Sequence, residues 1–167
     1  VSILVLSYDQ ENDADILGLI GGAAALHISD IPFKGPLSAT RVGRVDGAFL
    51  INPTSTNLDE SDLDFVVTGT PDYIMSLEGG AHEILEDDLT EAILLCHESI
   101  KNINAKIEEL RTLVGAPERR SYDSPKMDEE LGNKVREIAL PLIKEGNRTV
   151  EKQKRGELFG KAADLAV

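Results

Sequence analysis

The feature that most constrains the fold of this 167-residue chain is a long amphipathic helix, predicted over about residues 88–114. Apolar residues recur there in alternating steps of four and three, which places them in one continuous stripe. The stripe consists of Leu89, Ile93, Cys96, Ile100, Ile103, Ile107, Leu110 and Val114. At about 1.5 Å per residue the helix is roughly 40 Å long, enough to cross a whole sheet or reach a neighbouring subunit. Gly115 and Pro117 predict where it ends.

The residues before this helix predict a sheet with short connections. Strand-like runs occur at 3–6, 39–45, 48–51, 63–68 and 73–77. Asp46-Gly47 is a two-residue hairpin signal, and Gly79-Gly80 is expected to close the last run. Because successive strands are joined by short turns, we expect an antiparallel or mixed sheet packed on helices, which is an α+β fold.

A Gly- and Ala-rich helix is predicted at 16–28, apolar on nearly every side and therefore buried. Asn12 is the expected N-cap, and Asp13 and Asp15 fall in the first turn, where carboxylates suit the helix dipole. The glycines lie inside the helix and not in the turn before it, so they favour close packing over phosphate binding. The two carboxylates would repel an anion at this helix end.

The second part of the chain is all-helical. Helices are predicted at 128–139 and 150–166, with Pro141 interrupting or kinking the first and Gly146-Asn147 separating the two. The expected division is a domain at 1–117, a polar linker at 118–127 and a helical segment at 128–167. The chain begins at Val1 without an initiator methionine and closes within a helical pattern, so we expect a fragment of a longer protein.

The charge is distributed unevenly. Residues 1–115 carry 6 Lys and Arg against 20 Asp and Glu, a net charge of −14, whereas residues 116–167 carry 11 against 10. Nucleic-acid affinity comes largely from cationic side chains, so the first block should not bind RNA over a broad face. The single cysteine, Cys96, and the lack of a long apolar run favour a reducing, cytoplasmic location and no membrane partner.

The candidate chemical groups are few. Asp62 and Asp64 stand two apart at a predicted strand start, so they could share one face and hold Mg²⁺, although solvated loop charges are the stronger interpretation. No metal site and no catalytic residue is therefore predicted. Arg41 and Arg44 are candidate RNA-binding residues; three apart on a strand, they would face opposite sides, one available for phosphate and the other paired with a carboxylate.

The three histidines lack the spacing of metal ligands. His27, on the apolar helix, is expected to be a satisfied core or interface residue. His82 and His97 are expected at the surface.

Several strings in the chain resemble the polynucleotide phosphorylase family, in order and at similar separations. These strings are Ser29-Asp30-Ile31-Pro32-Phe33, Gly35-Pro36, Arg41-Val42-Gly43, Asn52-Pro53-Thr54, Leu63-Asp64, Val66-Val67 and Gly69-Thr70. Residues 2–115 are similar to the second half of the family's first ribonuclease PH-like domain. Residues 125–167 are similar to the start of its helical domain.

The resemblance implies a phosphorolytic 3'-to-5' exoribonuclease, a polyribonucleotide nucleotidyltransferase that uses inorganic phosphate as co-substrate and releases nucleoside diphosphates. It also implies a homotrimeric ring assisted by Mg²⁺, with RNA held mainly by parts outside this chain. Catalysis and Mg²⁺ belong to the family's second ribonuclease PH-like domain. An RNA-degradation assembly is a further partner that the resemblance leaves open.

The chain differs from the family's active domain at that domain's catalytic and phosphate-binding positions. Two Asp and a Lys of that domain align with Leu58, Asp64 and Val66, so only Asp64 is kept. Losing the Lys removes a cation that stabilises charge at the transferring phosphorus, and losing an Asp removes a metal ligand. Serines that receive phosphate align with Asp13 and Ala14.

Three hypotheses follow. In the first, the chain is a non-catalytic scaffold, trimerisation and RNA-path element of such an enzyme. In the second, the segment is itself catalytic, with Asp62 and Asp64 holding Mg²⁺. In the third, it is an oligomerisation module not involved in RNA turnover.

Overall fold

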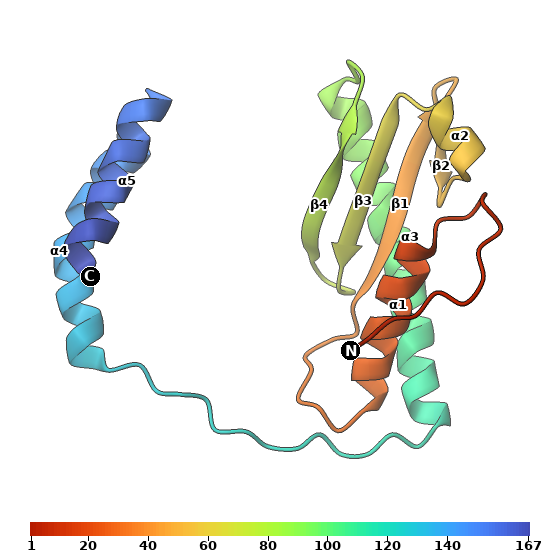
Figure 1. The fold of residues 1–167 in the computed structure, drawn as a ribbon, viewed down its shortest axis with the longest axis horizontal. Helices are drawn as coiled ribbons and strands as arrows, with labels where there is room; N and C mark the ends of the chain where they lie inside the picture. The colour runs from red at the N-terminus through yellow and green to blue at the C-terminus, as the bar shows by residue number, and fades with distance from the viewer. The chain divides into compact units, whose positions relative to one another are not determined.

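The computed structural model describes all 167 residues, which form two compact units, Val1–Tyr122 and Asp123–Val167. The first unit holds a sheet and three helices, and the second holds two helices (Figure 1). The division falls inside the polar range 118–127. No helix is both long and apolar enough to cross a membrane.

A four-stranded antiparallel sheet is the centre of the first unit. Its strands are β1 (Ser38–Val45), β2 (Ala48–Ile51), β3 (Leu63–Gly69) and β4 (Ile74–Ala81), in the order β2-β1-β3-β4. The expected α+β class with an antiparallel sheet is confirmed. β4 is an edge strand; its side chains Met75 and Leu77 are 63% and 45% exposed, and Tyr73, directly before it, is 69% exposed.

Two positions, one in a turn and one in a strand, show how a positive φ selects glycine. Asp46 and Gly47 both have positive φ, 51° and 77°, as the predicted two-residue hairpin between β1 and β2 requires. The prediction that Gly79-Gly80 ends the last strand is wrong, because β4 continues through both residues. Gly79 has φ 152°, and a Cβ there would lie 2.0 Å from the Asp64 carbonyl oxygen, so only glycine lets β4 approach β3 this closely.

The long helix α3 (Glu86–Leu113) packs across one face of the sheet, behind it in Figure 1. Its buried stripe meets the strands in a core of Val42, Leu63, Val67, Ala92, Cys96 and Ile100. The predicted stripe is therefore confirmed from Leu89 to Ile107, which is 4% exposed. Leu110 and Val114 are 38% and 53% exposed, since α3 continues beyond the ends of the strands.

The helix α1 (Ala14–Ile28) lies where expected, but it is not buried on every side. Leu17 is 68% exposed, so the prediction of an all-round buried helix is wrong. The predicted strand at 3–6 is also wrong, because this stretch pairs with no strand of the sheet. Instead the Ile3 side chain lies over Gly18 and Gly22, where a Cβ would meet it at 3.4 and 3.3 Å.

A short helix, α2 (Ser55–Asp59), was not expected from the sequence. It begins with a reciprocal capping box, in which the Thr54 hydroxyl accepts from the Asn57 amide and the Asn57 side chain accepts from the Thr54 amide. The box ends in Asn instead of the usual Glu or Gln. Its five residues are too few for a periodic pattern to show.

The second unit is a pair of helices, α4 (Glu129–Arg148) and α5 (Lys152–Ala166). The Asp128 carboxylate caps α4 by accepting from the amides of Glu130 and Leu131. α4 runs through Pro141, so the helix is not interrupted there; the proline removes one backbone hydrogen bond. Gly146 does not separate the helices but lies inside α4, where a Cβ would come within 2.4 Å of the Phe159 ring.

The core makes a direct prediction about stability. Ile100→Ala removes a fully buried side chain from the contact between α3 and the sheet, so the free energy of unfolding should fall by about 2–5 kcal/mol. Leu94→Ala, on the same helix at a position that is 57% exposed, should cost less than about 1 kcal/mol. Urea unfolding of both variants measures the difference, and equal losses would contradict this description of the core.

Candidate functional site

The candidate site is built around Arg41, in the middle of β1. Side chains alternate along a strand, and Val42 points into the core under α3, so Arg41 points to the opposite face. Arg44 lies on the α3 side, where it reaches Asp88 of that helix. The prediction that the two arginines face opposite sides is thus confirmed.

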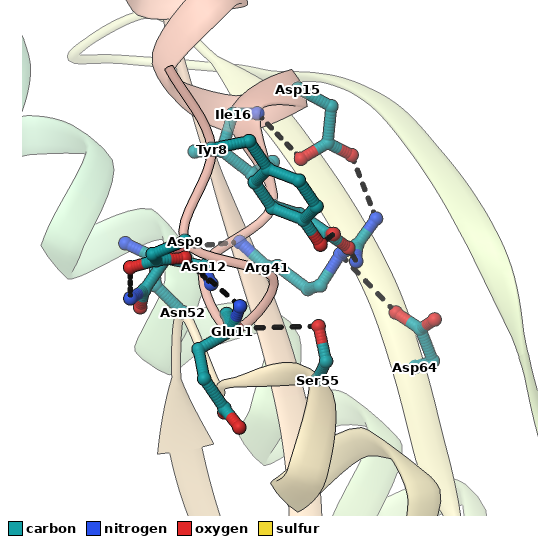
Figure 2. Close-up of polar contacts among 11 residues, drawn as sticks. Tyr8, Asp9, Glu11, Asn12, Asp15, Ile16, Arg41, Asn52, Ser55 and Asp64 are labelled. Carbon is teal, nitrogen blue, oxygen red and sulfur yellow. Dashed lines mark hydrogen bonds and ion pairs between the residues drawn. The ribbon is translucent and has the colours of Figure 1, made fainter.

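Arg41 is enclosed by carboxylates from two other elements (Figure 2). Its Nη1 donates to Asp13 Oδ2 at 2.7 Å and its Nη2 donates to Asp15 Oδ2 at 2.7 Å. On β3, Asp64 Oδ1 lies 3.5 Å from Arg41 Nε. The Arg41 side chain is only 15% exposed, so these partners have largely replaced water around the guanidinium.

The first residues of α1 bind this arginine. The N-cap residue is Asp13, not Asn12 as expected, and its side chain makes no capping hydrogen bond. It binds Arg41 instead and accepts from the Tyr8 hydroxyl at 3.3 Å. Asp15 divides its oxygens between Arg41 and the Ile16 amide, so both carboxylates are fixed by the arginine.

The turn before α1 is held by Asp9, which accepts from the amides of Glu11 and Asn12 and from the Asn12 side chain. These hydrogen bonds, chiefly those from Asn12, lower the pKa of Asp9 to about 2. The Glu11 carbonyl in turn accepts from the Ser55 amide at 2.8 Å, which joins this turn to α2. Figure 2 shows the turn beside Arg41.

Asn52 is a site residue that sequence reasoning missed. It follows β2 with φ 49°, a left-handed conformation that asparagine tolerates. Its Oδ1 accepts from the Arg41 amide at 3.0 Å, and its own amide donates to the Arg41 carbonyl at 2.8 Å. The only signal in the sequence is the turn-forming Asn52-Pro53 pair, which does not indicate a contact with β1.

These groups line an open cleft of about 430 Å³. The cleft is lined by Asp9, Asn12, Asp13, Asp15, Ile16, Leu17, Ile20, Arg41, Asn52 and Pro53. Three carboxylates and one guanidinium give this lining a net negative charge. An incoming phosphate would have to displace carboxylates that already bind Arg41, so the cleft is poorly suited to bind anions.

Arg44 forms the matching cluster on the other face of the sheet. It donates to Asp62 through Nε and Nη2 and to Asp88 through Nη1 at 2.6 Å. These contacts raise the pKa of Arg44, and hydrogen bonds from Arg44 are the main cause of the lowered pKa of Asp62. Where the sequence led us to expect one free arginine and one paired arginine, both are paired.

The two aspartates considered as a metal pair contact different arginines. Asp62 is bound by Arg44 at 2.6 Å, whereas Asp64, which is 53% exposed, lies 3.5 Å from Arg41. No group of three or more His, Cys, Asp or Glu side chains is placed to hold a metal ion. Val66 lies directly opposite Arg41 on β3, and Leu58 lines a different cavity, next to Asp62 and Asp64.

The remaining reactive side chains are outside the cleft. His27 is buried, as expected, and hydrogen-bonded to Glu108. His82 is exposed, while His97 is half-buried and bonded to the Thr70 carbonyl, so the surface prediction holds only for His82. Burial raises the pKa of the Cys96 thiol to about 12, which leaves it protonated and unreactive.

Comparisons with known proteins agree with the resemblance inferred from the sequence strings. Residues 35–99 match the 3' exoribonuclease family, domain 2. The chain is 44% identical over 156 residues to the polyribonucleotide nucleotidyltransferase of Geobacter sulfurreducens and 46% identical over 151 residues to that of Alkaliphilus oremlandii. These alignments cover 93% and 90% of this chain but only 22% and 21% of the relatives, so the chain spans about a fifth of their length.

The Arg44 cluster predicts that the stability of the fold depends on pH. The folded state lowers the pKa of Asp62 below the ordinary 3.8. The ionised Asp62 therefore stabilises the fold fully above pH 3.8, and this stabilisation is lost as the pH falls through the pKa that Asp62 has in the folded state. Asp62→Asn should therefore lower the melting temperature near pH 7, by an amount that shrinks below about pH 4. The exposed Asp123→Asn is the control; a deficit for Asp62→Asn that is constant down to pH 2 would contradict the assignment.

The Arg41 cluster predicts weak anion binding. Inorganic phosphate should bind only weakly in the cleft of the unaltered chain, whereas Asp13→Ser with Asp15→Ser frees the guanidinium and should tighten binding by about tenfold or more. Titration with phosphate, followed by NMR of the Arg41 side-chain N–H, measures both. Asp72→Ser with Asp123→Ser makes the same charge change elsewhere and should have no such effect. Equal phosphate affinity in the unaltered chain and the Asp13/Asp15 variant would contradict the prediction.

Proposed function

We propose that this chain, whose residues 35–99 belong to the 3' exoribonuclease family, domain 2, is a non-catalytic segment of a phosphorolytic 3'-to-5' exoribonuclease. The whole protein would be a polyribonucleotide nucleotidyltransferase, the name its relatives carry. It would act in the cytoplasm, degrade RNA with inorganic phosphate and release nucleoside diphosphates. Mg²⁺ and phosphate would be bound outside this segment.

One observation carries the non-catalytic assignment: the guanidinium of Arg41 is already bound by Asp13 and Asp15 at 2.7 Å each. Phosphorolysis needs a site that accepts phosphate and stabilises further negative charge in the transition state. Here the one cation of the cleft is neutralised, and the strand position opposite it holds the apolar Val66. Nothing in the cleft replaces the missing positive charge.

The segment's contribution would be structural. The exposed apolar side chains of β4 provide a surface for subunit contacts in a homotrimer, and the sheet would help to frame the RNA path. RNA binding by Arg41 and Arg44 remains a prediction, and it would require each arginine to exchange a carboxylate for a phosphate. RNA would be held mainly by other parts of the protein.

The alternatives make different predictions. A catalytic segment would need Asp62 and Asp64 to be released from their arginines and to bind Mg²⁺ together. An oligomerisation module unrelated to RNA would self-associate, and its removal from the full-length protein would leave RNA affinity unchanged. The similarity to polyribonucleotide nucleotidyltransferases over nine-tenths of the chain favours the exoribonuclease segment.

The deciding experiment compares phosphate-dependent release of nucleoside diphosphate from a short RNA in the presence of Mg²⁺. The purified chain should release none above background. In the full-length protein, Asp64→Asn should leave the turnover number within about twofold, because the change only weakens a surface ion pair. Phosphorolysis by the chain alone, abolished by Asp64→Asn, would overturn the proposal.

A further inference from the structure

A second polar cluster, unrelated to the Arg41 cleft, lies at the C-terminal end of α1. Its centre is His27, which is 1% exposed and lies next to α3 and to the residues that follow α3. His27 Nε2 is 2.7 Å from Glu108 Oε2, and His27 Nδ1 is 3.3 Å from Arg119 Nη2. The Phe33 ring packs edge-on against the imidazole, with the ring centres 6.3 Å apart.

These two partners assign the protonation state of the imidazole. A guanidinium only donates hydrogen bonds, so Nδ1 next to Arg119 must accept and carries no proton. An ionised carboxylate only accepts, so Nε2 next to Glu108 must carry the proton. Both contacts are hydrogen bonds at once only in the neutral Nε2–H tautomer of His27, which would link a carboxylate on α3 to an arginine beyond it.

Other contacts fasten the same stretch of chain to the first unit. Arg111 donates through Nη1 to the His27 carbonyl and through Nη2 to the Pro117 carbonyl, the latter at 2.7 Å. The Arg120 amide donates to the Asp30 carbonyl at 2.8 Å, and its guanidinium pairs with the Asp30 carboxylate at 3.0 Å. Residues 117–120 are thus held against the end of α1, just before the chain leaves the first unit.

We propose that His27 is a pH-sensitive latch for residues 117–120. Neutral His27 accepts from Arg119 and holds this stretch in place. When Nδ1 takes a proton from solvent, it loses its lone pair, and two cations then face each other across the same contact. The bond to Glu108 is kept, because a carboxylate accepts equally well from a charged imidazole, so α1 stays on α3 while Arg119 is released.

Three charged groups face His27. Glu108 lies at Nε2, Arg119 lies at Nδ1, and Arg111 donates to the backbone carbonyl. Asp30, in the turn after α1, is occupied by Arg120. Only the Arg119 contact changes from attractive to repulsive on protonation, which makes it the movable part of the cluster.

The test uses the unaltered chain and two NMR readouts followed across the same pH series. The imidazole ¹⁵N shifts of His27 report its tautomer and its titration, and hydrogen exchange of the Arg120 amide reports the attachment of residues 117–120. We expect an unprotonated Nδ1 in the neutral form. We expect the protection of the Arg120 amide to fall about three- to tenfold as His27 takes a proton, while amides in the middle of α3 keep theirs.

A variant separates the latch from a general loosening of the fold at low pH. Arg119 is exposed, so Arg119→Ala should leave the protein folded, lower Arg120 protection at neutral pH by a similar factor and abolish its dependence on the His27 titration. Arg136→Ala, the same change on α4, should leave both readouts as they are in the unaltered chain. A protonated Nδ1 in neutral His27, or Arg120 protection that does not follow the His27 titration, would overturn the latch.

Discussion

The first unit depends on one constraint: an arginine in the middle of a strand, 15% exposed, must be neutralised where it stands. Removing water from a guanidinium is costly unless charged partners with good geometry replace it. The chain supplies two carboxylates at 2.7 Å from the first turn of α1 and a third from β3. Because Asp13 and Asp15 are fixed to Arg41, the start of α1 is fixed to the sheet.

The same constraint accounts for the chemistry of the cleft. A helix N-terminus above a strand arginine would ordinarily attract anions, since the helix dipole and the guanidinium both favour negative charge. Here Asp13 and Asp15 provide that charge from within the chain. The arrangement that fixes α1 to the sheet therefore also occupies the place where an anion would bind, so the structural role and the lack of phosphate chemistry that we propose would have one cause.

Features governed by local patterns could be predicted from the sequence. The stripe of α3, the Asp46-Gly47 hairpin and the opposite orientation of Arg41 and Arg44 each follow from a periodicity or a turn preference. The position of Asp13 and Asp15 at the start of α1 was also predictable. Their partner was not, because nothing local shows that the α1 N-terminus and β1 meet on the same face.

The predictions that failed depend on contacts distant in sequence. The run at 3–6 has strand-like composition, yet it joins neither edge of the sheet, and Ile3 packs on Gly18 and Gly22 instead. Gly79 looks like a strand end but is required where β4 closely approaches β3. Asn52 belongs to a turn-forming pair, but that pair does not indicate its role, which is a pair of hydrogen bonds to a strand residue eleven positions earlier.

The most direct test of the central claim is a crystal structure of the chain determined in the presence of inorganic phosphate and Mn²⁺. Our account predicts that Arg41 keeps Asp13 and Asp15 as its partners, that no phosphate is ordered in the cleft, and that no anomalous manganese signal lies beside Asp64. A phosphate bound to the Arg41 guanidinium, with the two carboxylates turned away, would contradict it.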